Sequence, residues 1–297
     1  MRLVVYATRR SMLALAQCRA FVARLRAAEP SLEARELQVV TSGDRVQDRP
    51  LSEIGGKGLF VKEIEEALLD RRADFAVHSL KDVPASIPDG LVLACVPGRE
   101  DAHDVLIAPR HGTLDALPPK ARVGTSSLRR MVAIRARRPD LQIVPMRGNV
   151  DTRLRKVDAA ECDALVLARA GLVRLGLQGR ATEVLSFEVS LPAPGQGALS
   201  IECRSDDEEV RALLARLHDA TVAACVAAER GVLEALGGDC KTPLGAHAER
   251  VGGVFHLRAF IAKPDGSNYR HGERRVAPPA NESEARALGL ELGQSLV

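Results

Sequence analysis

Aromatic side chains are scarce in this sequence of 297 residues: they make up 3% of it, and tryptophan is absent. Proteins that bind single-stranded nucleic acid stack the bases on aromatic side chains, so the composition disfavours that class. The formal net charge of +3 is too small to mark a nucleic-acid-binding protein by itself. We therefore expect no nucleic-acid partner, and a core built from leucine, valine, isoleucine and alanine.

The sequence also lacks paired cysteines and long apolar runs. None of its six cysteines forms a Cys-x-x-Cys pair, and neither they nor the seven histidines have the spacing of a metal site. This pattern is typical of a reducing compartment. The apolar stretch that follows Arg9-Arg10-Ser11 is too short for an export signal, and no other stretch has the length of a membrane span. We expect a cytoplasmic protein with no bound metal and no membrane partner.

What the sequence contains is the composition of an ordinary globular protein, with 46% hydrophobic and 27% charged residues. A domain holds roughly 150 residues, so the chain allows two or three of them. Segments with the pattern of a strand alternate with segments that have the period of a helix, which favours crossover connections and mostly parallel sheets. We predict an α/β fold in which two α/β domains are followed by a small α+β domain.

This alternation defines the elements that we expect. Strands are predicted at 3–7, 37–41, 74–77, 105–108, 122–124, 141–145, 164–168, 198–203, 254–261 and 269–276. Helices are predicted at 59–69, 127–137, 151–157 and 219–236, after Ser11 as the N-cap of a first helix, and at the end of the chain. Residues 42–58 are expected to form a long polar loop. We place domain 1 at 1–98 with 198–217, domain 2 at 99–197 and domain 3 at 218–297.

Arginine is concentrated in the second α/β unit. Between Arg122 and Lys156 there are ten basic residues and only two acids, Asp140 and Asp151. A solvated basic face is one interpretation of this stretch, and we favour it for three of its members, which are Arg135, Arg137 and Arg138.

Other arginines in this stretch stand where anions bind. Thr125 and Ser127 lie between a predicted strand and a predicted helix, where free backbone N–H groups bind anions, and Arg129 and Arg130 follow them. Ligands of open α/β sheets bind at the carboxyl ends of the strands. We predict an anion site that is formed by these residues together with Arg147, at the next strand end, and Arg153.

Polar residues also follow a predicted buried strand of the first unit, where His78, Ser79, Lys81 and Asp82 leave the strand end together. A carboxylate beside a cleft can stabilise a developing cation or move a proton. Taken alone, the same residues are equally compatible with a capping aspartate and a solvated lysine. The pattern therefore marks a candidate site without defining a reaction.

The stretch Gly55-Gly56-Lys57-Gly58 does not fit a phosphate-binding loop, because Leu51 stands where that motif requires glycine. It predicts a glycine-hinged lid, with a plain surface loop as the alternative. Cys240 lies on a predicted turn beside Lys241, where a thiol is partly ionised and nucleophilic. Cys18 and Cys225 are expected to be buried in helices instead.

Seven segments together, and in their order along the chain, resemble the porphobilinogen deaminases, a family also called hydroxymethylbilane synthases. They are Ala7-Thr8-Arg9-Arg10-Ser11, Gly55-Gly56-Lys57-Gly58-Leu59-Phe60, 78–84, 124–130, Arg147-Gly148-Asn149-Val150, Pro194-Gly195-Gln196-Gly197 and Cys240. Each segment alone is weak evidence, whereas the ordered set is specific and spans nearly the whole chain.

The resemblance implies two domains similar to those of periplasmic binding proteins, with the active site in the cleft between them and a third domain that carries the cofactor. It implies a transferase of porphyrin and heme biosynthesis, which joins four porphobilinogen molecules head to tail with loss of ammonia. The primer would be a dipyrromethane, bound to Cys240 through a thioether, and hydrolysis would release hydroxymethylbilane. Members of the family are usually monomeric, so no obligate protein partner is expected.

The resemblance also assigns the site residues. Asp82 would be the catalytic residue that stabilises cations and shuttles protons. The carboxylates of substrate and cofactor would be bound by Arg9, Ser11, Ser79, Lys81, Thr125, Ser127, Arg129, Arg130, Arg147, Arg153 and Arg174. Lys57, Phe60 and Gln196 would belong to the lid and the cleft.

Two other classes of function remain as alternatives. A non-catalytic two-lobed protein that binds a small carboxylate ligand would explain the arginines, but not a loop thiol such as Cys240 or the pair Lys81-Asp82. A nucleic-acid-binding protein is disfavoured by the small net charge and the missing aromatics.

Overall fold

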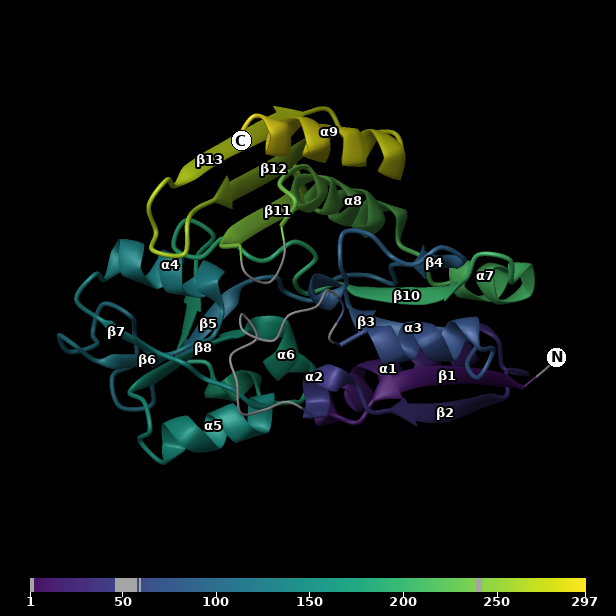
Figure 1. Ribbon diagram of the computed structural model, residues 1–297, viewed down its shortest axis with the longest axis horizontal. Helices are drawn as coiled ribbons and strands as arrows, with labels where there is room; N and C mark the ends of the chain where they lie inside the picture. Colours follow the sequence, from purple (N-terminus) through teal and green to yellow (C-terminus); the bar gives the residue numbers. More distant parts are fainter. Residues whose placement is uncertain (1–2, 46–57, 59, 239–241) are drawn as a thin grey trace.

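The computed structural model describes residues 3–45, 58, 60–238 and 242–297. Their strands form two five-stranded sheets and one three-stranded sheet (Figure 1). This arrangement confirms the expected mixed α/β fold with a smaller C-terminal unit. None of the described helices is both long and apolar enough to span a bilayer.

The first sheet has the strand order β2-β1-β3-β10-β4. Its strands are β1 (Val4–Arg9), β2 (Ala34–Val39), β3 (Phe75–Ser79), β4 (Leu91–Cys95) and β10 (Leu199–Arg204), and its helices are α1 (Met12–Ala28), α2 (Ser42–Arg45), α3 (Lys62–Leu69) and α7 (Glu208–Ala215). Strand β10 is antiparallel to both of its neighbours. Phe21 of α1 packs edge-on against Phe75 of β3, which fixes the helix on the sheet.

The second sheet repeats this plan, with the order β7-β6-β8-β5-β9. Its strands are β5 (Asp104–Ile107), β6 (Arg122–Gly124), β7 (Gln142–Val144), β8 (Ala164–Ala168) and β9 (Glu183–Leu185), and its helices are α4 (Leu128–Arg137), α5 (Val150–Asp158) and α6 (Arg169–Arg174). Here β5 is the antiparallel strand. In each sheet the antiparallel strand is the one that the chain forms on arriving from the other sheet. The other four strands of each sheet run in one direction, as expected for a mostly parallel sheet.

The third sheet is an antiparallel meander of β11 (Leu244–Val251), β12 (Val254–Ile261) and β13 (Arg270–Val276), covered by α8 (Ala220–Ala235) and α9 (Glu282–Gln294). The two helices approach very closely, since a Cβ atom on Gly289 would lie 1.9 Å from the carbonyl oxygen of Ala228. In Figure 1, α8 lies between this sheet and the first one. It thus faces two domains at once.

The expected elements are present, and the differences lie in short or weakly patterned segments. The sequence prediction missed β4, β9, β11, α6 and α7, and it assigned to a loop the residues that form α2. Strand β9 has three residues and pairs only with β5, so its conformation depends on a distant partner rather than on a local pattern. The domain limits 1–98 with 198–217, 99–197 and 218–297 stay predictions.

Candidate functional site

A cavity is lined by residues of the first and second α/β units. From the first unit it takes Arg9 and Ser11 at the carboxyl end of β1, Leu13 and Gln17 on α1, and Ser79, Lys81 and Asp82 at the carboxyl end of β3. From the second unit it takes Arg130 on α4, residues 147–151 and 153 around the start of α5, and Arg174 at the end of α6. The carboxyl ends of β1 and β3 therefore meet the arginine-rich side of the second sheet, as the strand-end argument predicted.

The sequence places Lys81 and Asp82 in this cavity through an abrupt end of β3. Leu80, Lys81 and Asp82 form a short 3₁₀ helix, η1, that follows Ser79 directly. Leu80 is buried, while Lys81 and Asp82 are exposed to the cavity. One turn thus anchors itself in the core with its apolar residue and presents an ammonium and a carboxylate to the same space.

Ser79 is fixed by a residue that sequence reasoning missed. The Nε2 group of Gln17 donates a hydrogen bond to the Ser79 hydroxyl at 2.9 Å, and both side chains line the cavity. Gln17 is buried, with 5% of its surface exposed. A polar residue that interrupts the apolar face of a helix was the available signal.

Ser11 has two roles in the structure. Its hydroxyl accepts a hydrogen bond from the Ala14 N–H group at 3.2 Å, which confirms it as the N-cap of α1. Ser11 also lines the cavity, together with Arg9. The guanidinium of Arg9 lies over the ring of Phe60, 4.3 Å from its centroid, so a residue of the expected lid contacts a residue of the expected binding site.

The cationic side chains of the cavity lie close enough to lower one another's pKa. Enclosure by protein lowers the pKa of Lys81 to about 8, and the nearby Arg130 lowers it further in the same direction. Burial lowers the pKa of Arg153 to about 10, with contributions from Arg130 and Arg147. Burial also lowers the pKa of Arg174. A cavity in which cations are held against their own repulsion favours an anionic ligand.

Several of these cations are held in place by backbone carbonyl groups. The Nε group of Arg153 donates to the carbonyl oxygen of Gly148 at 2.7 Å, and Arg174 donates to that of Gly197 at 2.6 Å. Gly197 has a φ of +86°, and a Cβ atom there would lie 2.2 Å from the carbonyl oxygen of Glu100. The glycine is therefore required for the turn that receives Arg174.

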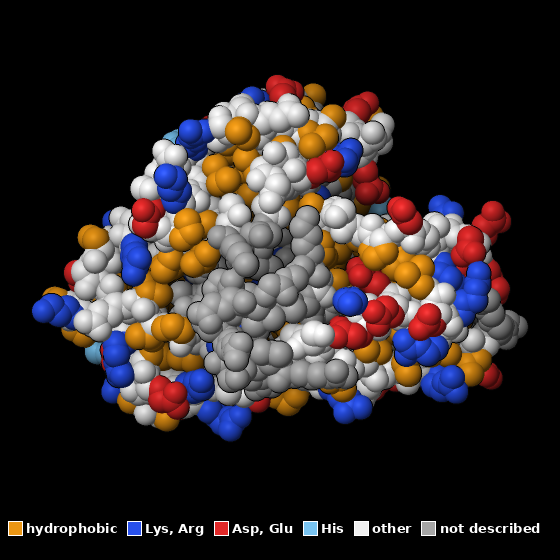
Figure 2. All heavy atoms as spheres, in the orientation of Figure 1, with side chains coloured by type: hydrophobic (Ala, Val, Ile, Leu, Met, Phe, Trp, Pro, Cys, Tyr) orange, Lys and Arg blue, Asp and Glu red, His pale blue; other side chains and the backbone are white. Residues whose placement is uncertain are grey.

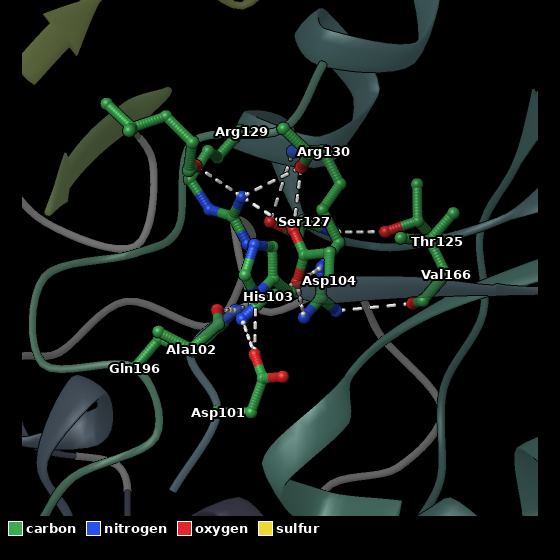
Figure 3. Close-up of polar contacts among 12 residues, drawn as sticks. Asp101, Ala102, His103, Asp104, Thr125, Ser127, Arg129, Arg130, Val166 and Gln196 are labelled. Carbon is green, nitrogen blue, oxygen red and sulfur yellow. Dashed lines mark hydrogen bonds and ion pairs between the residues drawn. The ribbon is translucent and has the colours of Figure 1, made fainter. Parts of the chain in front are cut away.

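Arg129 and Arg130 converge on a buried carboxylate (Figure 3). Asp104, at the start of β5, accepts hydrogen bonds from Arg129 Nη1 at 2.8 Å and from Arg130 Nη2 at 2.7 Å. Ser190 and Gln196 donate to the same carboxylate at 2.7 Å and 2.9 Å. Burial alone would raise the pKa of Asp104, but the two guanidinium groups hold it well below its usual range. We call these five residues the Asp104 cluster.

The side chains of Thr125 and Ser127 accept hydrogen bonds from backbone N–H groups at the start of α4. The Thr125 hydroxyl accepts from the Ser127 N–H group at 3.1 Å, and Ser127 is the N-cap of α4. Both lie outside the lining of the cavity, as do Arg129 and Gln196. Ten of the predicted residues do line it: Arg9, Ser11, Phe60, Ser79, Lys81, Asp82, Arg130, Arg147, Arg153 and Arg174. The remaining two, Lys57 and Cys240, lie outside the described residues.

Of the three arginines that we interpreted as a solvated face, Arg135 and Arg137 are exposed. The interpretation was wrong for Arg138, which has 17% of its side chain exposed and donates to the carbonyl oxygens of Leu114 and Leu117 at 2.9 Å. Arg137 pairs with Asp115 at 2.6 Å, and Arg138 pairs with Asp140 at 2.7 Å. On the face shown in Figure 2, basic and acidic side chains are interspersed over the described surface. Cys18 and Cys225 are buried, as predicted. Within the described part of the chain, no group of three or more His, Cys, Asp and Glu side chains could hold a metal ion.

Comparison with known proteins identifies the family. Residues 4–212 match the family model described as porphobilinogen deaminase, dipyromethane cofactor binding domain, and residues 223–297 match the one described as porphobilinogen deaminase, C-terminal domain. The chain belongs to the porphobilinogen deaminase family. A curated porphobilinogen deaminase from Sorangium cellulosum (strain So ce56) is 63% identical over 290 residues, which cover 98% of this chain and 97% of the relative.

Solved structures of periplasmic proteins are similar to part of this chain. The VFT2 domain of Bordetella pertussis BvgS is 16% identical, with a TM-score of 0.42, over 72% of this chain and 86% of that one. A putative sulfonate-binding protein, SsuA from Methylobacillus flagellatus, is 12% identical, with a TM-score of 0.41, over 77% and 67% of the two chains.

Proposed function

We propose that this member of the porphobilinogen deaminase family makes hydroxymethylbilane. It joins four porphobilinogen molecules head to tail, with loss of ammonia, on a dipyrromethane bound to Cys240, and it releases hydroxymethylbilane by hydrolysis. The observation that carries the proposal is one cavity in which Asp82 faces the cationic side chains of both α/β units. The dipyrromethane, when bound, supplies the pyrrole to which the first substrate molecule is joined.

The chemistry of the cavity residues fits such a ligand. Each pyrrole of substrate and primer carries an acetate and a propionate group, so the growing chain is a polycarboxylate. The cavity offers guanidinium groups, an ammonium and hydroxyl groups, all of which donate hydrogen bonds to carboxylates. We propose that the carboxylates are held by Arg9, Ser11, Ser79, Lys81, Arg130, Arg147, Arg153 and Arg174.

Asp82 is the acid–base group in this proposal. The substrate develops positive charge as ammonia leaves, and a fixed carboxylate beside it stabilises that charge. The same carboxylate can accept the proton that the attacking pyrrole carbon must lose, and can give a proton to the departing amine. Because Asp82 stands on the short turn η1, its backbone is held while its side chain faces the reacting groups.

The predicted residues outside the lining receive a different role. Arg129 contacts Asp104 rather than the cavity, and Asp104 in turn contacts Arg130. We propose that Arg129, Gln196, Thr125 and Ser127 act by holding Arg130 and the start of α4 in place. Cys240 as the attachment point and Lys57 as part of a lid remain proposals, as do the three domain limits, a monomeric state and a cytoplasmic location.

Turnover of porphobilinogen tests the proposal directly. The wild-type protein is expected to release ammonia and to form a linear tetrapyrrole. Asp82→Asn is expected to lower turnover by roughly 100-fold to 1,000-fold, because the amide cannot stabilise a cation. Asp151→Asn is the matched control, since Asp151 also lines the cavity but pairs with Arg155 at 3.7 Å.

Two outcomes would contradict the proposal. Binding of porphobilinogen by the wild-type protein without release of ammonia would favour the non-catalytic binding protein instead. Turnover in Asp82→Asn equal to that of Asp151→Asn would remove the role assigned to Asp82.

A further inference from the structure

The turn that carries Lys81 and Asp82 rests on a helix of the third domain. Leu80 and Val83, which flank these two residues in the chain, are both buried, with 1% and 3% of their surface exposed. They belong to one apolar cluster with Ala223 and Val226 of α8. The apolar underside of the turn is therefore packed on α8, while its polar side faces the cavity.

Arg230, also on α8, contacts the backbone directly after Asp82. Its guanidinium donates to the carbonyl oxygens of Val83 at 3.3 Å, Pro84 at 2.8 Å and Ala85 at 3.1 Å. Burial lowers the pKa of this arginine, although a guanidinium stays charged at neutral pH. Three consecutive carbonyl groups that share one cation form a clamp, and this clamp fixes the exit of the turn.

The helix that provides the clamp is itself anchored. Glu229, the neighbour of Arg230, is buried, and its carboxylate accepts hydrogen bonds from Arg99 at 2.6 Å and from the Gly195 N–H group at 2.6 Å. Both partners lie on the segments by which the chain crosses between the first two sheets. A Cβ atom on Gly195 would lie 2.8 Å from Leu80, so these segments also touch the turn. The position of α8 relative to the turn is thus fixed from two sides.

We propose that Arg230 is a positioning residue for Asp82, through which the third domain sets the place of the catalytic carboxylate in the cavity. Arg230 does not line the cavity, so it acts through the backbone of residues 83–85 rather than on the ligand. The inference rests on the proposed function of Asp82. It predicts that loss of the clamp lowers kcat more than it raises KM for porphobilinogen, because Asp82 lies on the clamped turn, whereas most of the groups that bind carboxylates lie on other elements.

Three variants test the inference. Arg230→Met removes the donors and keeps most of the length of the side chain, whereas Arg230→Lys keeps one charged donor group. Arg286→Met is the matched control, because Arg286 also makes a contact to α8, an exposed pair with Glu234 at 2.6 Å. Intact mass gives the fraction of each protein that carries the primer, and kcat is expressed per primed, folded molecule.

We expect kcat of Arg230→Met to fall roughly 10-fold to 100-fold, the scale of a misplaced catalytic group. Arg230→Lys should recover part of this loss, and Arg286→Met should keep the wild-type kcat. A role in stability alone would lower the folded fraction but not kcat per primed molecule, so it would overturn the inference. If Arg230→Met does not fold, Arg230→Lys decides: a kcat equal to that of Arg286→Met contradicts the inference.

Failure of the role proposed for Arg230 can be told apart from failure of the proposed function. Absence of turnover in the wild-type protein would remove the proposed function itself. Normal wild-type turnover, loss in Asp82→Asn and no loss of kcat in either Arg230 variant would remove only the role of Arg230.

Discussion

Two groups of arginines from the same stretch of sequence have opposite surroundings. In the Asp104 cluster, Arg129 and Arg130 share a buried carboxylate that balances part of their charge. Arg153, in contrast, forms no salt bridge with any residue that the structure describes, and its Nε group is held by a carbonyl oxygen. A buried acid therefore ties an arginine to the fold: Arg129 contacts Asp104 and not the cavity, and Arg130 contacts Asp104 while it also lines the cavity. Arg153, which forms no salt bridge with a described residue, offers its charge to a ligand.

The largest expected effect comes from removing the acid of the Asp104 cluster. Asp104→Asn should lower the free energy of unfolding by about 3–5 kcal/mol, because two buried guanidinium groups lose their carboxylate. Urea unfolding at pH 7 measures this change, with Asp115→Asn at the exposed pair of Arg137 as the control.

The pH dependence of the same variant sharpens the comparison. The pKa of Asp104 is lower in the folded protein than in the unfolded chain, so its stabilisation is present above the unfolded pKa of about 3.9 and is lost as the pH falls below it. The wild-type protein should therefore lose its advantage over Asp104→Asn in acid. An advantage that persists unchanged at low pH would contradict this account.

Next in size is a pair of variants that should behave in opposite ways. Arg153→Leu should lower kcat/KM by roughly 10-fold to 100-fold, the value of a charged hydrogen bond, with no earlier unfolding. Arg129→Leu should unfold at lower urea, because Asp104 then keeps only Arg130 as its cationic partner. Steady-state kinetics and urea titrations of both proteins measure the difference, and the same pattern in both would erase the distinction between the two groups.

A smaller effect is expected from Lys81. Its pKa of about 8 means that the side chain is an ammonium below pH 8 and loses its charge above it. Since kcat/KM reports the free enzyme, it should fall several-fold as the pH rises from about 7 to 9. Lys81→Arg keeps the charge in this range, so its profile should stay flat there; a parallel fall in both proteins would assign the effect to another group.

The smallest effect is expected at the surface. Arg137→Leu breaks the exposed pair with Asp115, and exposed pairs contribute little to stability. Neither the urea midpoint nor kcat/KM should change measurably. A clear loss in either would mean that the solvated arginines take part in the site.

Local signals in the sequence were sufficient for much of the fold. Ser11 was recognisable as an N-cap because this small hydroxyl residue stands directly before a helical pattern. Ser127 was predicted as the first residue of a helix and is the N-cap of α4. The insertion of β10 between β3 and β4 could not be predicted, because it depends on pairing between residues more than a hundred positions apart. For the same reason β4 and β9 were missed.

The site was predictable as far as strand ends and charge are local. Ser79 ends β3, Lys81 and Asp82 come directly after it, and the structure places all three in the cavity. The role of Arg129 was not predictable, because its partner Asp104 lies outside the basic stretch, at the start of β5. Counting acids only between residues 122 and 156 therefore overestimated how much of the arginine charge has no acidic partner. Arg230 was missed because its contacts join two domains.

The measurement that tests the central claim most directly is the intact mass of the purified protein under denaturing conditions. We predict an excess over the sequence mass equal to two deaminated porphobilinogen units, which persists in Cys225→Ala and is absent from Cys240→Ala. An unmodified mass that does not rise after incubation with porphobilinogen would contradict the claim that this chain builds tetrapyrroles on a covalent primer.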